Sequence, residues 1–147
     1  MVLNCDCIRD ILLCIEEIVE PRKFAVFIDT ELLKKTNQNT LRFTNNSVIE
    51  NYQYQLLTKY SNKELIYHLN YCVKDKLIDL RNDSNSIAII VEDLTPKGHQ
   101  LIANIRYDSV FEKTKRICKD LGVKSLSSFV QVAENVTSEL IKSHFIS

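Results

Sequence analysis

The stretch from residue 60 to residue 105 constrains the fold of this chain more than any other part. It opens with Ser61-Asn62-Lys63-Glu64, in which a serine suited to a helix N-cap is followed three residues later by a glutamate. The two side chains of such a capping box can each accept a backbone N–H, so the pair predicts a helix that starts here. Helical spacing then predicts its buried face, which comprises Leu65, Leu69, Cys72, Val73 and Leu77.

Two short apolar runs follow at residues 77–80 and 87–91, and the segment between them is polar and rich in turn-forming residues. This pattern predicts a β-hairpin. Thr95 and Pro96 then suit the N-cap and the first position of another helix, which Gly98 would allow to pack closely against a neighbour. A helix, a hairpin wing and a capped helix in this order are typical of a winged helix.

Further amphipathic helices are predicted on both sides of this stretch. The first spans residues 5–19, with Pro21 just beyond its end, and a later one spans residues 110–121, capped by Asp108 or Ser109 and ended by Gly122. A last helix, from 125 to 145, either packs back on the domain or pairs with a copy of itself. The inner faces of the two C-terminal helices are predicted to carry Val110, Phe111, Ile117, Cys118 and Leu121, and then Leu126, Phe129, Val130, Ala133, Val136, Leu140 and Ile141.

Residues 21–58 are predicted to form an irregular insertion. Within it, residues 23–28 suit a strand, residues 29–33 a short helix capped by Asp29, and residues 36–40 a loop. The segment 50–56 alternates polar and apolar residues, which predicts a half-buried strand that pairs with the wing as a third strand. A basic cluster of Lys34, Lys35 and Arg42 flanks the loop. Two interpretations of this cluster are a solvated surface and a site that contacts phosphate.

The length of 147 residues predicts a single domain, residues 1–147, with a winged-helix-like core at 1–106 and C-terminal helices at 107–147. A hydrophobic content of 45% with only two glycines and two prolines favours an ordered, mostly helical α+β domain with a small antiparallel sheet. Nineteen basic and nineteen acidic side chains give a formal net charge of zero, which disfavours strong non-specific binding to nucleic acid but leaves room for a local basic face.

The sequence predicts a cytoplasmic protein without a metal or other cofactor. It shows no signal peptide and no apolar run long enough to span a bilayer, so no membrane partner is expected. Five cysteines, an odd number, are expected to be reduced thiols. Cys5-x-Cys7 has no second Cys/His pair at zinc-finger spacing, and two glycines cannot build a Gly-rich phosphate loop.

Three segments carry a resemblance to a known family. They are 6–13 with Ile15-Glu16-Glu17, then Tyr60-Ser61 through Tyr67-His68-Leu69 to Leu77-Ile78, and Leu94-Thr95 with Gly98-His99 and Asn104-Ile105-Arg106. In order and spacing they resemble the small phage- and prophage-associated proteins of domain of unknown function 2513. The region 21–58 looks longer here, Lys76 stands where the family tends to have glycine, and Pro96-Lys97 replaces a Trp-acid pair. The resemblance implies a winged-helix-like fold, a phage or prophage setting in the host cytoplasm, and no known reaction.

Catalysis is not predicted, and no catalytic residue is assigned. His68 lies one turn from Glu64 and one turn from Cys72, so a Cys–His pair is geometrically conceivable. Cys72 belongs to the apolar stripe, however, which favours a structural His68 that is hydrogen-bonded near the junction of helix and wing. His99 is likewise expected to be a packing or capping residue.

Double-stranded DNA is the first predicted partner, with the helix from Asn62 to Lys76 as the recognition element. Amide side chains can read base edges and ammonium groups can bind phosphates, while Glu64, Asp75, Asp79 and Asp83 dilute the positive field. The candidate binding residues are Lys63, Tyr67, Asn70, Tyr71 and Lys74 on the helix, with Arg81 and Asn82 at the wing. The cationic face of residues 113–119 would strengthen this interpretation if it lies on the same side.

The alternative function is a protein-interaction module that binds and inhibits a host factor such as an antiviral defence nuclease. A neutral surface with exposed tyrosines suits such a role, because aromatic side chains favour the centre of protein interfaces, and Tyr67 and Tyr71 are the candidates. The last helix adds a further predicted partner, a second copy of the chain in a homodimer.

Overall fold

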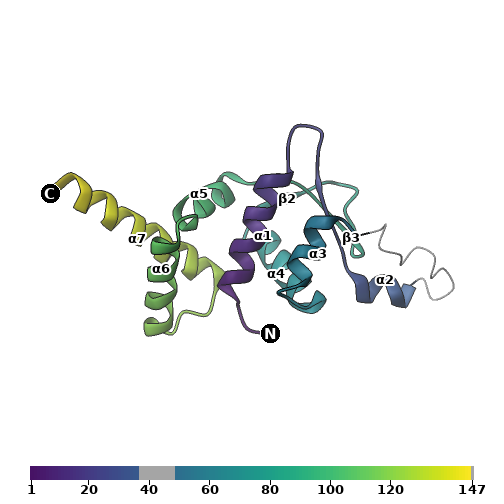
Figure 1. Ribbon diagram of the computed structural model, residues 1–147, viewed down its shortest axis with the longest axis horizontal. Coiled ribbons are helices and arrows are strands. Elements are labelled where there is room, and N and C mark those ends of the chain that lie inside the picture. Colours follow the sequence, from purple (N-terminus) through teal and green to yellow (C-terminus); the bar gives the residue numbers. More distant parts are fainter. Residues whose placement is uncertain (37–48, 147) are drawn as a thin grey trace.

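The computed structural model describes residues 1–36 and 49–146, most of them helical, with one small antiparallel sheet (Figure 1). The mostly helical α+β class is therefore confirmed. The elements in chain order are α1 (Cys5–Ile18), β1 (Ala25–Ile28), α2 (Thr30–Thr36), α3 (Asn51–Leu57), α4 (Asn62–Lys74), β2 (Ile78–Leu80), β3 (Ala88–Leu94), α5 (Pro96–Ile105), α6 (Asp108–Leu121) and α7 (Leu126–Ile146).

The sheet has the strand order β1-β3-β2, with β3 antiparallel to both neighbours. Ala25 lies opposite Val91 in one pair of strands, and Ile78 lies opposite Leu94 in the other. The predicted hairpin and the strand predicted within residues 23–28 are both confirmed. The third strand is thus β1, which lies between α1 and α2 in the chain, and not the segment at 50–56.

The strand predicted at residues 50–56 is wrong, because this segment forms the helix α3. Its polar side chains nevertheless reach the sheet, where they bond the outer edge of β1. The Gln53 amide donates to the carbonyl of Ile28 at 2.7 Å and accepts the Ile28 N–H at 2.8 Å. The Tyr52 hydroxyl accepts the Val26 N–H at 2.6 Å. The helix therefore supplies through side chains the hydrogen bonds that a neighbouring strand would have supplied through its backbone.

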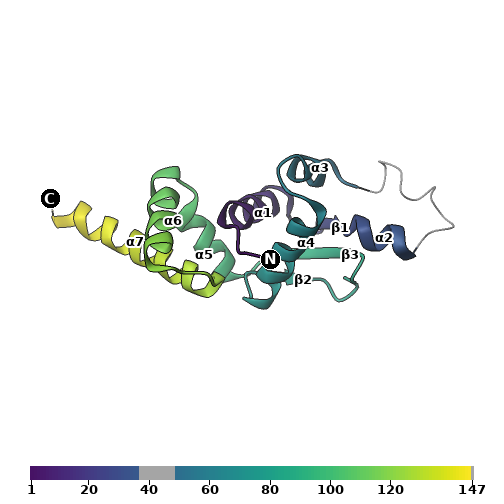
Figure 2. The ribbon, with the colours of Figure 1, turned by 90° about the horizontal axis from the view of Figure 1, so that it is seen from below.

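Helix α1 is the central packing element, and it contacts α3, α4, α5 and β3. The amphipathic helix predicted at residues 5–19 is confirmed, since Ile8, Ile11, Leu12 and Ile15 on one face are fully buried, while Ile18 and Val19, predicted on the same face, are half-buried. Figure 2 shows the sheet and α2 on one side of α1 and the α5–α7 lobe on the other. The helix thus joins the two halves of the molecule through one continuous core.

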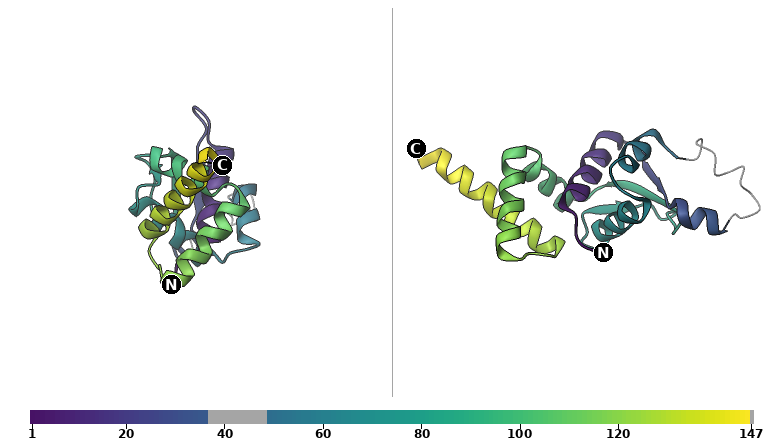
Figure 3. Two further views of the ribbon diagram at one scale, coloured as in Figure 1. Left: turned by 90° about the vertical axis from the view of Figure 1, so that its left-hand side faces the viewer. Right: turned by 60° about the horizontal axis from the view of Figure 1, so that its bottom comes forward.

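The α5–α7 lobe forms around Phe111 of α6 and Phe129 of α7, whose ring centroids lie 6.4 Å apart in an edge-to-face arrangement. Figure 3 shows that α7 runs past the other two helices and leads away from the body. The predicted burial of Leu140 and Ile141 is accordingly wrong, because these residues come after α7 has left α5 and α6; they are 43% and 53% exposed.

Two further expectations for α6 need correction. The helix begins at Asp108 with Tyr107 at the N-cap, and no side chain caps it, so neither Asp108 nor Ser109 has the predicted capping role. Leu121 is 70% exposed, while Thr114 occupies a fully buried position on the inner face. Gly122 ends the helix in the left-handed conformation, as predicted.

The predicted helix at 29–33 is confirmed as α2, and the Asp29 carboxylate accepts the Leu32 N–H at 3.1 Å as a cap. Lys34 and Lys35 are exposed in its last turn. Most of the predicted loop at 36–40, together with Arg42 of the basic cluster, lies outside the described residues.

Gly98 gives α5 its close approach to the strand that follows α4. A Cβ atom at this position would lie 2.1 Å from the carbonyl oxygen of Leu77, a separation that no side chain can adopt. The same oxygen accepts the Thr95 N–H at 3.0 Å, so the backbones are in direct contact. The predicted close packing at Gly98 is confirmed.

We expect Gly98→Ala to destabilise the protein by about 3 kcal/mol or more, because the added methyl group meets fixed backbone and not a movable side chain. Urea unfolding followed by circular dichroism measures the change. Ala103→Ser, which adds one atom at an exposed position of the same helix, is the matched control and should change stability by less than about 0.5 kcal/mol. An equally small effect of Gly98→Ala would contradict the close approach.

Lys76 follows α4 in the left-handed backbone conformation, with φ of 58°. Glycine is the residue that adopts this conformation without a steric cost from Cβ. The position is also the one at which this chain departs from the glycine expected by resemblance. The structure therefore explains that departure as a tolerated substitution at a helix C-terminus.

We expect Lys76→Gly to raise the free energy of unfolding by about 0.5–1 kcal/mol, because relief of the left-handed strain outweighs the extra freedom of the unfolded chain. Gly122→Ala makes the opposite change at the other left-handed helix end, with φ of 67°, and should lower stability by a similar amount. Parallel urea titrations of both variants test the pair. A destabilised Lys76→Gly variant would be the contradicting result.

Candidate nucleic-acid interface

Helix α4, which carries most of the candidate binding residues, is fixed by its own N-cap and by hydrogen bonds to two other segments of the chain. The Ser61 hydroxyl accepts the Glu64 N–H at 3.1 Å, which confirms the predicted N-cap. Asn62 bonds two groups at the start of α2: its amide donates to the Asp29 carboxylate, and its oxygen accepts the Thr30 N–H, each at 3.0 Å. The start of the helix is therefore held in position.

The second half of the predicted capping box is wrong, because Glu64 does not return to Ser61. Its carboxylate accepts instead from the side-chain amide of Asn4 at 2.7 Å. The backbone N–H of Asn4 donates to Nε2 of His68 at 2.8 Å, and Nδ1 of His68 lies 2.7 Å from the Glu64 carbonyl. Because Nε2 accepts, the proton of this neutral imidazole lies on Nδ1 and is donated to that carbonyl.

His68 is fully buried, and both of its ring nitrogens are occupied by hydrogen bonds. This arrangement agrees with the structural role expected for it, although it lies where the chain before α1 meets α4 and not at the junction of helix and wing. Cys72, the other half of the conceivable pair, is fully buried in the core cluster, and this burial raises the pKa of its thiol. The two side chains therefore have surroundings typical of packing residues.

Asn4, which was not among the residues predicted to matter, connects the start of α1 to α4 and also caps α1 by accepting the N–H groups of Asp6 and Cys7. An asparagine just before a helical pattern is a common N-cap, so the cap was detectable from the sequence. The bonds to Glu64 and His68 join residues 60 and 64 positions apart, and no local pattern reports such contacts.

The outer face of α4 presents Lys63, Tyr67, Asn70 and Lys74, which follow one another at helical spacings of four, three and four residues. The opposite face is buried through Leu65, Leu69 and Cys72, so this row points away from the core. The rise of about 1.5 Å per residue separates the two lysines by roughly 16 Å along the axis. The structure thus brings these four candidates together on one exposed face.

The outer row of α4 contains two cations and no acid. Within the described residues, neither Lys63 nor Lys74 forms an ion pair. The Glu64 carboxylate, which was expected to dilute the positive field, accepts a hydrogen bond from the side-chain amide of Asn4. The local charge of this face is therefore more positive than the neutral composition suggests.

The two tyrosines are partly buried and lie against each other, with ring centroids 5.8 Å apart and an edge-to-face geometry. Tyr67 also contacts the ring of His68 at a centroid distance of 5.1 Å. Tyr71 lies on the flank of the helix rather than in the outer row. These contacts limit the freedom of both rings, so a ligand would meet pre-positioned aromatic edges.

At the wing, Arg81 is already engaged within the protein. Its Nε donates to the Asp83 carboxylate at 3.0 Å, and its guanidinium lies 4.2 Å from the centroid of the Phe24 ring. Asn82 is exposed at the start of the turn. Of the two wing candidates, only Asn82 presents a side chain that is not committed to such contacts.

The cationic face of α6 is split. Lys115 pairs with Asp6 at 3.1 Å and with Glu112 at 3.3 Å, whereas Lys113, Arg116 and Lys119 are exposed. A surface hollow is lined by Lys119 and Lys115 together with Glu64, so this end of α6 lies near the first turn of α4. The structure thus brings only the Lys115–Lys119 end of this face close to α4.

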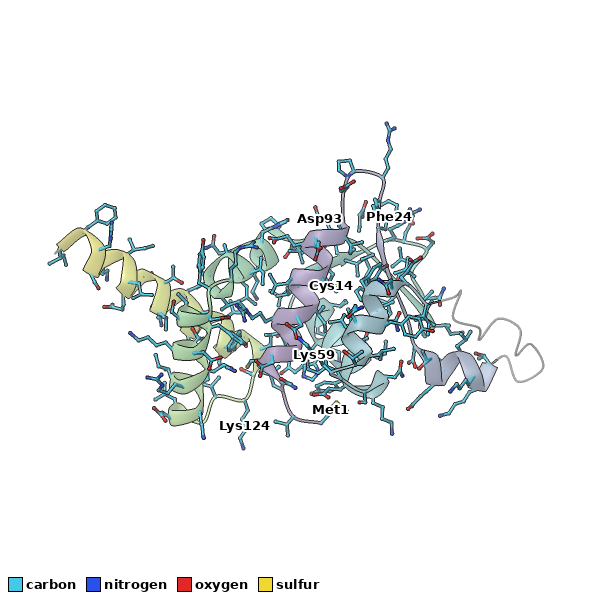
Figure 4. The ribbon with its side chains drawn as sticks, in the orientation of Figure 1. Met1, Cys14, Phe24, Lys59, Asp93 and Lys124 are labelled. Atoms are coloured by element: carbon cyan, nitrogen blue, oxygen red, sulfur yellow. The ribbon has the colours of Figure 1, made fainter. Side chains whose placement is uncertain are left out.

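A surface hollow lies between α1 and α3, with a volume of about 520 Å³, and Figure 4 labels Cys14 and Lys59, two of the residues that line it. Two of its three charged residues pair with each other, since the Asp10 carboxylate lies 3.5 Å from the Lys59 ammonium. The same carboxylate accepts from the Tyr60 hydroxyl at 2.6 Å. Burial raises the pKa of Cys14 to about 12, which keeps its thiol protonated.

Two remaining sequence candidates have simple surroundings. Desolvation by burial raises the pKa of both Cys5 and Cys7 to about 12, and no group of three or more metal-ligating side chains is found in residues 1–36 and 49–146. His99 is exposed and lies 3.6 Å from the Asp93 carboxylate, so the expected packing or capping role is wrong for its side chain.

The fold and the site define a small, mostly helical α+β domain in which one well-anchored helix exposes a cationic face. Over residues 2–124 the chain matches the family described as hypothetical protein (DUF2513), and it belongs to that family. No curated protein and no solved structure matches it. In the described part of the chain, no helix is long and apolar enough to cross a membrane.

We expect His68→Ala to lower the free energy of unfolding by about 2–4 kcal/mol, because it removes a buried ring and leaves the Asn4 N–H without its acceptor. Chemical denaturation measures the change. His99→Ala removes an exposed imidazole from the same protein and should change stability by less than about 0.5 kcal/mol. Comparable stability of the two variants would contradict the structural role of His68.

Proposed function

We propose that this protein is a winged-helix DNA-binding protein in which α4 enters the major groove. The observation that carries the proposal is the outer row of α4, in which Lys63, Asn70 and Lys74 are exposed and Tyr67 is half-buried. Contacts of the first turn with Asn4 and with the start of α2 fix the position of this helix. The row combines cations for phosphates with an amide for a base edge, which are the two kinds of contact that duplex recognition requires.

The arrangement of the elements supports the winged-helix part of the proposal. Helices α3 and α4 are joined by a four-residue connection, residues 58–61, which suits a helix-turn-helix in which the second helix meets DNA. The β2–β3 hairpin follows α4 directly, as a wing does, and its strand β3 pairs with β1, which lies between α1 and α2 in the chain. This order places α4 and the hairpin turn on consecutive segments of the chain.

The dimensions of α4 also suit the groove. The major groove is about 12 Å wide, and it admits an α-helix. Lys63 and Lys74 lie roughly 16 Å apart along the helix, so their flexible side chains can reach phosphates on the two sides of the groove. Asn70 lies between them, at the position from which an amide can pair with adenine.

The neutral overall charge limits long-range attraction between this protein and DNA. A protein with a formal net charge of zero gains little from its general electrostatic field, so its affinity should depend on the local cations of α4. Arg81 is held by Asp83 and Phe24, so we assign the wing a minor share of the phosphate contacts. We propose no catalytic role, in view of the bonded His68 and the protonated thiols.

A protein-interaction module is the second candidate function. The ordered pair of Tyr67 and Tyr71 on the same helix favours it, because aromatic side chains with restricted freedom are frequent anchors of protein interfaces. In the phage or prophage setting that the family resemblance implies, such a module would bind and inhibit a host factor such as an antiviral defence nuclease. Both candidates use α4, and they differ in whether salt controls the binding.

A fluorescence-anisotropy titration of mixed-sequence duplex DNA at low and moderate salt tests the DNA proposal. We expect salt-sensitive binding, and we expect Lys63→Ala/Lys74→Ala to weaken it by on the order of tenfold while reducing the salt slope by about 2. Arg22→Gly/Lys23→Ala is the matched control, since it removes two exposed cations from the turn before β1, and glycine suits the left-handed Arg22.

Absence of binding at low salt would contradict the DNA proposal, because the phosphate contribution acts on any duplex, and would direct the search to a pull-down of protein partners. Equal loss of binding in the control variant would contradict the assignment to α4. Where binding is seen, selection from a randomised duplex pool with Asn70→Ala tests base reading. That variant should lose a base preference at one position and retain its affinity for mixed-sequence DNA.

A further inference from the structure

The two edge strands of the sheet differ in whether the rest of the chain bonds their outer sides. On β1, Tyr52 and Gln53 of α3 bond the N–H and carbonyl groups of both Val26 and Ile28. On β2, the other edge strand, no side chain or backbone group of the described residues makes such bonds. One edge of the sheet is therefore covered, and the other is open.

The register shows which backbone groups form the open edge. Leu77 and Arg81, on either side of β2, each make a backbone hydrogen bond to the other arm of the hairpin, at 3.0 and 2.9 Å. Because neighbouring residues of an antiparallel strand alternate in direction, Ile78 and Leu80 turn their N–H and carbonyl groups away from β3. These are the groups that an additional strand would bond.

A hollow with a volume of about 770 Å³ lies beside the open edge. The end of α4, β2 itself and the start of α5 line it, and its apolar side chains include Val73, Leu80 and Pro96. Val73 and Leu80 are half-buried, and Pro96 is exposed. A strand added to β2 can therefore place a large apolar side chain in the hollow while its backbone bonds the edge.

The hollow is flanked by two lysines, Lys76 after α4 and Lys97 in the first turn of α5. Both are exposed, and within the described residues neither forms an ion pair. Asp79 is the one acid among the described residues that line the hollow. Strand alternation places its side chain on the face of the sheet opposite to that of Ile78, so the charge beside the hollow is positive.

Both lysines occupy positions that local chemistry disfavours. Lys76 has a left-handed backbone, with φ of 58°, which is unfavourable for a residue with a Cβ atom. Lys97 lies in the first turn of a helix, where the helix dipole favours an acid. Binding of an anionic partner accounts for an ammonium group at each position.

We propose that the β2 edge, defined as the outward backbone groups of Ile78 and Leu80 with the hollow beside them, binds an extended acidic segment of a partner protein as a fourth strand. The segment carries a large apolar side chain for the hollow and carboxylates for Lys76 and Lys97. This surface is distinct from the outer row of α4, so the inference goes beyond the proposed function.

Two other occupants fit the β2 edge less well. Duplex DNA offers phosphates to the lysines, but it leaves the apolar hollow and the open backbone groups unused. A second copy of this chain brings the same two lysines, so it lacks the complementary charge. An acidic strand uses all three features of the surface.

Selection from a displayed library of random twelve-residue peptides, without DNA, tests the proposal. We expect enriched peptides to combine a large apolar residue with several acids, and to bind with a dissociation constant of the order of 10 μM in fluorescence anisotropy. Lys76→Ala/Lys97→Ala should weaken this binding by about fivefold to tenfold. Arg22→Gly/Lys23→Ala, which removes two exposed cations elsewhere, is the matched control and should change it by less than about twofold.

Leu80→Pro tests the strand addition itself, because proline removes an N–H that points away from β3 and leaves the bonds within the sheet intact. Leu80→Ala shortens the same side chain but keeps the N–H, so it is the matched control. We expect the proline variant to bind the peptide about fivefold more weakly than the alanine variant. In the unmodified protein, the peptide should slow hydrogen exchange of the Leu80 amide and leave the Asp79 amide, which faces β3, unchanged.

Failure of the library to yield acidic peptides would overturn the proposal, as would equal binding by Leu80→Pro and Leu80→Ala. Loss of duplex binding in Lys76→Ala/Lys97→Ala, with no peptide enriched, would assign the lysines to DNA instead. A dimer of the free protein that Leu80→Pro abolishes would assign the β2 edge to a second copy.

The exchange measurement decides the matter if Leu80→Pro fails to fold, since a Leu80 amide that the peptide leaves unprotected would overturn the proposal. The selection contains no DNA. Its outcome is therefore separate from that of the DNA titration.

Discussion

The direct backbone contact between Leu77 and Gly98 is the constraint on which the two halves of the molecule depend. One carbonyl oxygen accepts the Thr95 N–H and lies where a side chain on Gly98 would be. The Thr95 hydroxyl donates to the Lys76 carbonyl at 2.6 Å, so the end of α4 and the start of α5 are bonded at adjacent residues. This contact sets where α4 lies relative to the α5–α7 lobe, and hence which face of α4 solvent can reach.

Local patterns predicted most of the fold. Caps at Ser61 and Thr95, the turn between β2 and β3, and the glycine at the end of α6 predicted the positions of five elements, because each reflects chemistry within a few residues. The strand prediction for residues 50–56 was wrong, because the alternation of polar and apolar residues there occurs in a helix. Tertiary contacts decided that segment, since Tyr52 and Gln53 bond β1 from a helix.

The candidate site was predictable in its residues but not in its surroundings. Helical periodicity placed Lys63, Asn70 and Lys74 on one exposed face, because it needs only the sequence. The ion pair of Arg81 with Asp83 and the hydrogen bond between Glu64 and Asn4 depend on side-chain geometry, which the sequence pattern does not report. These two contacts change the electrostatics of the site in opposite directions, since one occupies a cation and the other removes an acid from the exposed face.

The side-chain bonds from α3 to β1 have a consequence for self-association. The outer edge of a sheet is a template on which further strands can add, and proteins block it in several ways. Here Tyr52 and Gln53 occupy the hydrogen-bonding groups of Val26 and Ile28, so an incoming strand would have to compete with a covalently attached helix. Helix α3 therefore acts as a built-in guard against amyloid-like growth from β1, independently of any role beside α4.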